Sequence, residues 1–202
     1  MNVSPLLSAS GIEFGYSRGK SVLSNLSFFL NPGEIVLLSG ANGSGKTTLI
    51  KILAGLIRSF KGQVDFQRGQ RSLFLPDALL YGDLTLGENL ELFGSLFQTS
   101  ARLHNECIEA MGIGDILRSP FRDLSRGQKI RGALARTFMA DTALTLLDEP
   151  LTGLDDEAAA RLGTLLAGLK ERGKTVLFST HHEAGFSGIV SRRLRLQGGA
   201  LV

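Results

Sequence analysis

One glycine-rich stretch, Gly40 to Thr48, constrains this chain more than any other part of it. It reads Gly-Ala-Asn-Gly-Ser-Gly-Lys-Thr-Thr and matches the pattern G-x-x-x-x-G-K-[ST]. Glycines permit backbone bends in which successive N–H groups point inward, toward phosphate oxygens. Glu34–Ser39 before it reads as a buried strand, and Lys46–Leu56 reads as a helix whose positive end faces the same anion. The stretch therefore predicts a phosphate-binding loop between a strand and a helix.

The residue types in this loop indicate a separate role for each side chain. Lys46 would supply a mobile positive charge to the outer phosphates of a nucleotide, and the Thr47 hydroxyl would bind Mg²⁺. The other loop residues expected to contact the phosphates are Gly40, Asn42, Gly43, Ser44, Gly45 and Thr48. A glycine-rich turn with an exposed lysine is the alternative, and it is disfavoured because the loop lies between a strand and a helix, as a phosphate site requires.

Two carboxylates follow another apolar strand, Ala143–Leu147. Beside a phosphate-binding loop, a strand-end aspartate such as Asp148 can hold Mg²⁺ directly or through water. Glu149 would then point toward the γ-phosphate and act as the catalytic base that polarises an attacking water. Two acidic residues after an apolar strand could also simply cap the strand end. The phosphate-binding loop elsewhere in the chain favours the catalytic role over this alternative.

Strand-like segments alternate with helical patterns along the chain, which is typical of an α/β layered fold. Further strands are predicted at Ile12–Tyr16, Val22–Leu30, Gln63–Phe66, Ser72–Leu75, Thr175–Ser179 and Leu194–Leu196, the last being taken as the final core strand. Residues 85–139 differ, because their periodicity predicts helices at Leu86–Phe97, Ala101–Met111 and Gly127–Phe138. We interpret this part as a helical subdomain inserted into the α/β core.

Composition excludes several classes of protein. The net charge of +3, from 22 basic and 19 acidic residues, is a weak footprint for nucleic-acid binding. Cys107 is the only cysteine, which excludes an intramolecular disulfide and fits a reducing cytosol. The first ten residues lack the pattern of a secretory signal. No apolar stretch approaches the ~20 residues that span a bilayer, so work at a membrane would require docking onto a spanning partner.

The order of the motifs resembles the nucleotide-binding domain of ABC transporters. Leu124–Gln128 is similar to the signature sequence L-S-G-G-Q of that family, and Leu154–Asp155 is similar to its D-loop. Ser179–His181 resembles the segment that carries the switch histidine, and Tyr16 matches the aromatic residue that stacks on adenine. The resemblance extends from about Tyr16 to Leu196, which is nearly the whole chain.

The resemblance implies an α/β P-loop NTPase with a RecA-like core, a mostly parallel sheet, amino-terminal antiparallel strands and an inserted helical subdomain. It implies one ATP-binding domain over residues 1–202, with the core at about 1–76 and 140–202 and the helical subdomain at about 77–139.

It also implies that two such domains, identical or different, face each other head to tail around ATP. Ser125, Gly127 and Gln128 of one would contact the nucleotide held by Lys46 of the other. Within this arrangement His181 would hold the γ-phosphate and the water, while Asp155 would serve the D-loop, cap a helix, or do both.

Two positions depart from the family pattern. Where the family usually has a glutamine that touches the metal, this chain has Asp77. Asp77 is a candidate Mg²⁺ ligand, but its negative charge beside the phosphates favours a contact less direct than that of glutamine, or none. Arg126 replaces the first glycine of the signature, and we expect its guanidinium to project into solvent rather than toward nucleotide.

By the same resemblance, the chain would be the ATPase motor of a transporter, docked at the cytoplasmic face of the inner membrane. Its partner would be an integral membrane subunit whose coupling helix docks near Leu80–Phe97. The short length and the ending Arg192–Leu196 are similar to the ATPase subunits of haem exporters used in cytochrome c maturation.

Two alternatives belong to other functional classes. Soluble ABC ATPases that act on nucleic acid or ribosomes usually carry two cassettes or long coiled-coil insertions, which this sequence lacks, so no nucleic acid is expected as a partner. A P-loop kinase or GTPase is disfavoured because no N-K-x-D motif is present and the signature has no role in those families.

Overall fold

The main sheet of the protein is largely parallel. In a computed structural model that describes residues 4–17, 20–58, 60–67, 71–74, 80–180, 186 and 188–202, this sheet has six strands. Their order is β5 (Arg71–Phe74), β6 (Leu144–Leu147), β7 (Thr175–Ser179), β3 (Ile35–Ser39), β8 (Arg192–Gln197) and β9 (Ala200–Leu201). All neighbouring pairs are parallel except β8 and β9.

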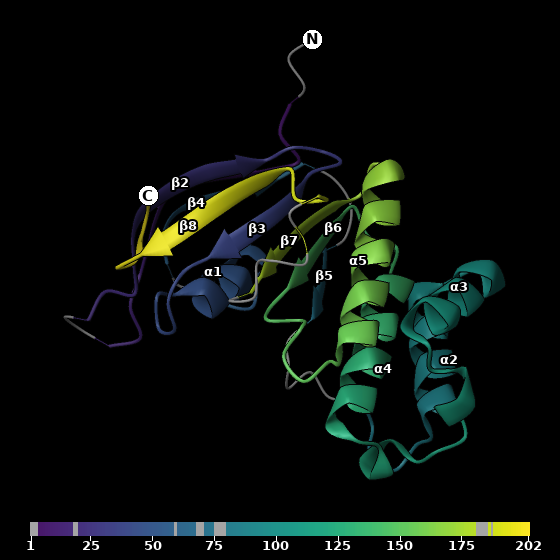
Figure 1. The fold of residues 1–202 in the computed structure, drawn as a ribbon. Helices are drawn as coiled ribbons and strands as arrows, with labels where there is room; N and C mark the ends of the chain where they lie inside the picture. Colours follow the sequence, from purple (N-terminus) through teal and green to yellow (C-terminus); the bar gives the residue numbers. More distant parts are fainter. Residues whose placement is uncertain are drawn as a thin grey trace.

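A smaller antiparallel sheet lies beside it (Figure 1), with the order β2 (Leu23–Leu30), β1 (Leu7–Phe14) and β4 (Lys61–Phe66). The predicted antiparallel strands at the amino end are thus confirmed, but β1 begins earlier than the expected Ile12. The pairing register shifts between Ala9 and Ile12, and this irregularity interrupts the alternation of buried residues that marks a strand in sequence.

The prediction that Leu194–Leu196 is the last strand of the core is wrong. β9 follows it and pairs antiparallel with β8 through a two-residue turn at Gly198 and Gly199, whose φ angles are 56° and 82°. Positive φ at both central positions is the requirement of a type I′ hairpin, and Gly-Gly meets it without strain. The turn signal was therefore present in the sequence.

The helices are α1 (Lys46–Leu53), α2 (Leu86–Phe97), α3 (Ala101–Met111), α4 (Arg126–Met139) and α5 (Asp156–Glu171). The predicted bounds of α2 and α3 are confirmed. α2 starts at a capping box between Thr85 and Glu88, and Ser100 caps α3. α1 ends before the expected Leu56, because the chain turns at Gly55 with φ 79°.

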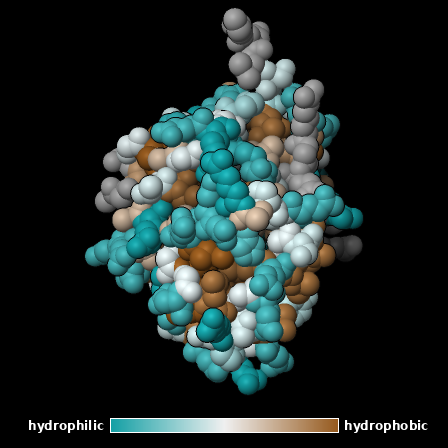
Figure 2. Space-filling view, turned by 90° about the vertical axis from the view of Figure 1, so that its right-hand side faces the viewer, coloured by the Kyte–Doolittle hydropathy of each residue, from teal (hydrophilic) through white to brown (hydrophobic). Residues whose placement is uncertain are grey.

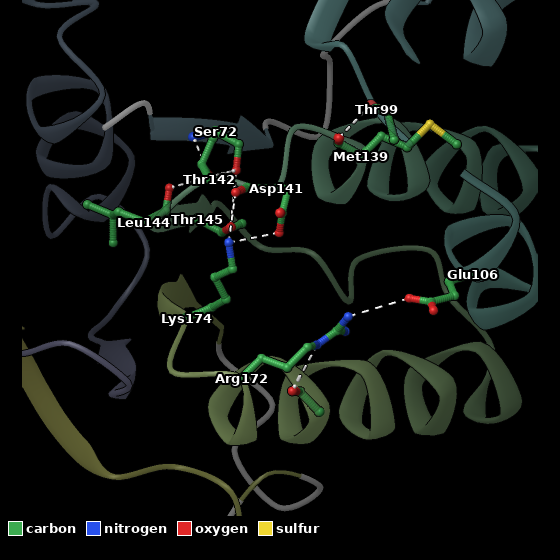
Figure 3. Close-up of polar contacts among 11 residues, drawn as sticks. Ser72, Thr99, Glu106, Met139, Asp141, Thr142, Leu144, Thr145, Arg172 and Lys174 are labelled. Carbon is green, nitrogen blue, oxygen red and sulfur yellow. Dashed lines mark hydrogen bonds and ion pairs between the residues drawn. The ribbon is translucent and has the colours of Figure 1, made fainter. Parts of the chain in front are cut away.

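The helices α2, α3 and α4 gather on one side of the molecule, away from α1 (Figure 1). Two polar contacts help to fix them, as Figure 3 shows. The Thr99 hydroxyl donates a 2.7 Å hydrogen bond to the carbonyl oxygen of Met139 at the end of α4. Arg172, just after α5, lies 3.5 Å from a carboxylate oxygen of Glu106 in α3. The first contact fixes two parts of the helical region to each other, and the second ties that region to the end of α5.

Buried hydroxyl groups join β5 to its neighbour β6 (Figure 3). Ser72 donates a hydrogen bond to the hydroxyl oxygen of Thr145, at 3.1 Å, and accepts one from Thr142, at 2.9 Å. β5 is an edge strand, and these side-chain bonds supplement its one ladder of backbone bonds to β6. They therefore help to hold the register of the two strands.

The parallel sheet is covered on both faces, which positions the functional loops. Along β3, Ile35 and Leu37 belong to one apolar cluster, while Val36 and Leu38 belong to the other. Because both faces are buried, the groups free to meet a ligand lie in the loops at the carboxyl ends of the strands. The ends of β6, β7 and β3 are adjacent, and they bring together segments far apart in the sequence.

Candidate nucleotide-binding site

The loop between β3 and α1 has the backbone conformation that its glycines predict. Gly40, Gly43 and Gly45 have φ angles of 151°, 78° and 106°. A Cβ on Gly40 would lie 2.3 Å from the carbonyl oxygen of Leu196, and a Cβ on Gly45 would lie 2.7 Å from Cδ2 of Leu23. Gly45 is also the N-cap of α1 and supplies no side-chain hydrogen bond to it. The first N–H groups of α1 therefore have no side-chain cap and can bind an anion.

This loop forms one wall of a cavity of about 710 Å³, which we call the nucleotide hollow. Most predicted binding residues line it: Tyr16, Asn42, Gly43, Ser44, Gly45, Lys46, Thr47, Thr48 and Glu149. Ser17, Lys20 and Val22 line it too, and sequence reasoning missed them because they carry no motif. Gly40 lines a second cavity, which shares Asn42, Gly43 and Ser44 with the first.

Lys46 lies at the base of the hollow with only 6% of its surface exposed. Its Nζ donates hydrogen bonds to the carbonyl oxygens of Gly40 and Ala41, at 2.8 and 3.4 Å. The same nitrogen lies 3.7 Å from Oε1 of Glu149. The lysine thus places its charge between the loop and the carboxylate that follows β6.

A chain of hydrogen bonds beneath the loop connects the start of α1 with the ends of β6 and β7. The Thr47 hydroxyl donates to Oδ2 of Asp148 at 2.7 Å, and the Ser179 hydroxyl donates to Oδ1 of the same carboxylate at 2.7 Å. Ser179 also accepts a 2.9 Å hydrogen bond from the backbone N–H of Glu149. Asp148 is only 3% exposed, and each of its carboxylate oxygens accepts a hydrogen bond from a protein hydroxyl, as a buried polar group requires.

Ser179 is a site residue to which the sequence analysis gave no role of its own, although it begins the predicted switch segment Ser179–His181. It ends β7, which lies between β6 and β3 in the sheet, and it is fully buried. Its backbone partner, Glu149, has φ 47°, a left-handed conformation that is uncommon for a residue other than glycine. The hydrogen bond from the N–H of Glu149 to Ser179 stabilises this conformation. The only sequence signal was a hydroxyl residue at a strand end.

Tyr16 forms the outer rim of the hollow and is 66% exposed, so it is not a core residue. Its hydroxyl shares a 3.2 Å hydrogen bond with the Thr48 hydroxyl, and its ring meets Phe14 edge-on, with centroids 4.9 Å apart. These two contacts orient the aromatic ring while leaving much of it accessible.

The signature residues form a separate feature at the start of α4, which we call the signature corner (Ser125, Gly127 and Gln128). Ser125 and Gln128 make a capping box: the Ser125 hydroxyl oxygen accepts from the N–H of Gln128 at 3.3 Å, and Gln128 Oε1 accepts from the N–H of Ser125 at 2.8 Å. A Cβ on Gly127 would lie 2.9 Å from the carbonyl oxygen of Gly153, so the corner touches the turn before α5. None of its residues is among those that line the nucleotide hollow.

The remaining predicted residues have mixed outcomes. Asp155 caps α5 by accepting a 2.8 Å hydrogen bond from the N–H of Ala158. Arg126 is exposed, as expected, although its side chain also passes beside Gly153. Asp77 and His181 lie outside the described residues.

The lone cysteine is not part of the site. Cys107 is buried in the helical region, and this burial raises the pKa of its thiol to about 12. The thiol is therefore protonated near neutral pH and is a poor nucleophile.

Comparison with known proteins defines the class. The family model for ABC transporters matches residues 23–152, and the chain belongs to this family. It is an ABC ATPase, the ATP-binding and ATP-hydrolysing motor subunit of a transporter. Among the described residues, no helix is long and apolar enough to cross a bilayer.

Two curated relatives and one solved structure illustrate the similarity. The chain is 36% identical to the "Cytochrome c biogenesis ATP-binding export protein CcmA" of Cupriavidus necator, over 88% of this chain and 83% of that protein. It is 35% identical to the protein of the same name from Hahella chejuensis, over 95% and 96%. A structure described as the ATP-binding subunit of an ABC transporter superposes with a TM-score of 0.87 at 25% identity, covering 97% of this chain and 88% of that one.

Proposed function

We propose that this subunit binds MgATP in the nucleotide hollow and hydrolyses it against the signature corner of a second, facing copy. The observation that carries the proposal is the hydrogen-bonded chain from Thr47 through Asp148 and Ser179 to Glu149, with the ammonium of Lys46 beside it. This chain joins a phosphate-binding loop to a carboxylate that has water-accessible surroundings. Such an arrangement suits metal-assisted attack of water on a terminal phosphate.

The phosphates would lie on the loop from Gly40 to Thr48. The N–H groups at the start of α1 would bind them, aided by the positive end of the helix dipole. Lys46, now bonded to two carbonyl oxygens, would transfer its hydrogen bonds to the outer phosphates. The accessible ring of Tyr16 would stack on the adenine.

The residues present fit a magnesium ion. Mg²⁺ prefers oxygen ligands and keeps several waters, and it is usually held by one or two protein oxygens plus phosphate. The Thr47 hydroxyl and the Asp148 carboxylate supply two oxygens that are already 2.7 Å apart. Because the Thr47 hydroxyl is the donor in its hydrogen bond to Asp148, the lone pairs of its oxygen remain available to a cation. Bound there, the ion would neutralise charge on the phosphates; Asp77 remains a predicted additional ligand.

Glu149 would remove the proton of the attacking water. Its carboxylate lines the hollow, close to the ammonium of Lys46, and its backbone is fixed through Ser179. A carboxylate so placed can accept a proton as the water attacks the γ-phosphate. The predicted role of His181 in holding phosphate and water is part of the same proposal.

The signature corner would complete the site of the facing copy. Its exposure and its separation from the lining of the hollow support action on another molecule. Ser125 accepts a hydrogen bond from Gln128 and so can still donate its own O–H to a γ-phosphate. The N–H of Gly127 and the helix dipole of α4 would add to this contact. Asp155 would serve the same interface while capping α5.

We further propose that one domain comprises the whole chain, with residues 77–139 as its helical subdomain. It would act at the cytoplasmic face of the membrane, where residues near Leu80–Phe97 would dock an integral membrane subunit. The names of the curated relatives support a role in the export step of cytochrome c biogenesis, and haem export remains the predicted form of that role. The family, relatives and structure reported above are described as transporter or export proteins, and none of those descriptions mentions nucleic acid.

The test is complementation between two impaired variants, mixed in equal amounts. Lys46→Ala removes the phosphate cation and Ser125→Ala removes the signature hydroxyl, so each homodimer has two defective sites. Mixing the two restores one intact site in each mixed dimer, and we expect roughly a quarter of the wild-type phosphate release, because half of randomly formed dimers are mixed. If the mixture is no more active than the two variants separately, the shared site is refuted.

A further inference from the structure

The outward face of α2 and the turn before it carry large apolar side chains. Tyr81, Leu92 and Leu96 are 58%, 38% and 66% exposed. The ring of Tyr81 stacks on Phe93, with centroids 6.2 Å apart. Leu96 is three positions after Phe93 and four after Leu92, a spacing that makes side chains neighbours on a helix. We call these four residues the α2 patch. Figure 2 shows hydrophobic side chains gathered on this helical side of the molecule. Contiguous exposed apolar surface of this kind marks a protein interface.

One cation lies against this patch without a counter-ion. The guanidinium of Arg136, on α4, stacks over the Phe93 ring, with its carbon 5.2 Å from the centroid. Its Nε is buried and has no hydrogen-bond partner. None of the ion pairs formed among the described residues includes Arg136. Burial lowers the pKa of Arg136. An arginine nevertheless stays charged near neutral pH, so the free chain leaves a partly desolvated charge uncompensated.

Two other arginines, one on α4 and one on α5, contrast with Arg136. On the same helix, Arg131 donates hydrogen bonds to the carbonyl oxygens of Met111 and Gly112. On α5, Arg161 pairs with Glu157. Their partners come from this chain and explain their positions. The position of Arg136 has no such explanation within the described residues, which suggests a partner from outside the chain.

We propose that Arg136 receives a carboxylate from the membrane subunit, and that the α2 patch is the apolar rim that surrounds this ion pair. The occupant is a cytoplasmic segment of that subunit that presents one Asp or Glu among apolar residues. The inference rests on the proposed function and adds the chemistry by which the partner is recognised.

The charge and the surface both favour this occupant. A carboxylate can bind a guanidinium through two parallel hydrogen bonds, and the apolar rim would exclude water from the pair. A nucleic-acid backbone is disfavoured as the occupant. Glu88 and Glu91 lie on α2, the helix that carries the patch, and they would repel a polyanion. An apolar segment without an acid would cover the patch but leave the arginine unpaired.

The experiment begins with the tagged, full-length wild-type chain in its own host. It is purified from detergent-solubilised membranes, and the polytopic protein that accompanies it is identified by mass spectrometry. Arg136→Met, which keeps an unbranched apolar stem and removes the charged guanidinium, is compared with Arg118→Met. Arg118 is an exposed arginine between α3 and α4, away from the patch residues in sequence.

For Arg136→Met we expect at least about a tenfold loss of the copurified membrane subunit, because one side of a desolvated charge pair is removed. Its melting temperature should equal or exceed that of the wild type, because an uncompensated charge has been removed from the free chain. Binding of a fluorescent ATP analogue should be unchanged. Arg118→Met should change none of these quantities.

Reversing the two charges tests directly whether Arg136 pairs with an acid of the membrane subunit. Arg136→Glu should lose the partner, and changing one acidic residue in a cytoplasmic segment of the identified subunit to arginine should restore it. The proposal is overturned if Arg136→Met copurifies like the wild type, if its loss follows a fall in melting temperature, or if no reversed acid restores binding. It is also overturned if Asp77→Asn gives the same loss, since the counter-ion would then belong to this chain. If the wild type itself copurifies with no integral membrane protein, the proposed function fails as well.

Discussion

The nucleotide hollow and the signature corner are stabilised in different ways. At the hollow, Thr47, Asp148 and Ser179 come from distant parts of the sequence and hold one another through hydrogen bonds, while Lys46 donates to the carbonyl oxygens of the loop. In the signature corner, the capping bonds join residues three apart, and the group expected to meet phosphate is exposed. The difference indicates that one copy can build the phosphate-binding half alone. The signature corner can contact a nucleotide only when it faces the hollow of a second copy.

The largest expected effect comes from removing the charge of the carboxylate in the hollow. Glu149→Gln is nearly isosteric, so the bonds of Lys46 and Asp148 should persist and ATP should still bind. Turnover should fall by about 100-fold or more, because a general base contributes on the order of 10²–10⁴ to the rate. Phosphate release and the binding of a fluorescent ATP analogue measure the two effects separately. Glu91→Gln, on the exposed face of α2, is the matched control; a Glu149→Gln variant that kept half of its turnover would exclude the base role.

A second prediction concerns the buried bonds that define the hollow. Ser179→Ala removes a donor to Asp148 and an acceptor for the N–H of Glu149. We expect a loss of about 2 kcal/mol in the free energy of unfolding, since unsatisfied buried polar groups cost roughly 1–3 kcal/mol. Urea unfolding measures it, with Ser95→Ala on the exposed surface of α2 as the control. A change no larger than that of the control would show that the hydrogen-bonded chain is not structural.

The hollow and the signature corner also differ in how well the sequence predicts them. The phosphate-binding loop and the signature corner are local, so their motifs and the helices α2 and α3 are readable from residues within a few positions. Ser179 is not readable, because its partners at Asp148 and Glu149 are about thirty residues away and are brought near only by the strand order. The start of β1 was missed for a related reason, since a shift in pairing between two strands disturbs the local pattern.

A smaller effect should follow from changing the signature corner. Ser125→Ala removes the hydroxyl that would donate to the γ-phosphate of the facing copy. One hydrogen bond to a charged group is worth ~1.5 kcal/mol, so turnover should fall about tenfold while a single copy binds ATP normally. Loss of the cap alone would also lower stability. Ser100→Ala controls for this, because Ser100 caps α3 in the same way and lies outside the proposed interface. If the two variants lose the same small amount of turnover, Ser125 serves only as a cap.

The smallest expected effect separates the two roles of Asp155. Its Oδ1 accepts a hydrogen bond from the N–H of Ala158, so Asp155→Ala should lower the free energy of unfolding by about 1 kcal/mol, the usual value of an N-cap. Asparagine offers the same acceptor without the charge and should recover most of that stability. Phosphate release by Asp155→Asn then reports on the interface alone. A stable Asp155→Asn variant with reduced turnover would place the charge in the shared site. Normal turnover would instead restrict Asp155 to capping and leave Ser125, Gly127 and Gln128 as the contribution of the facing copy.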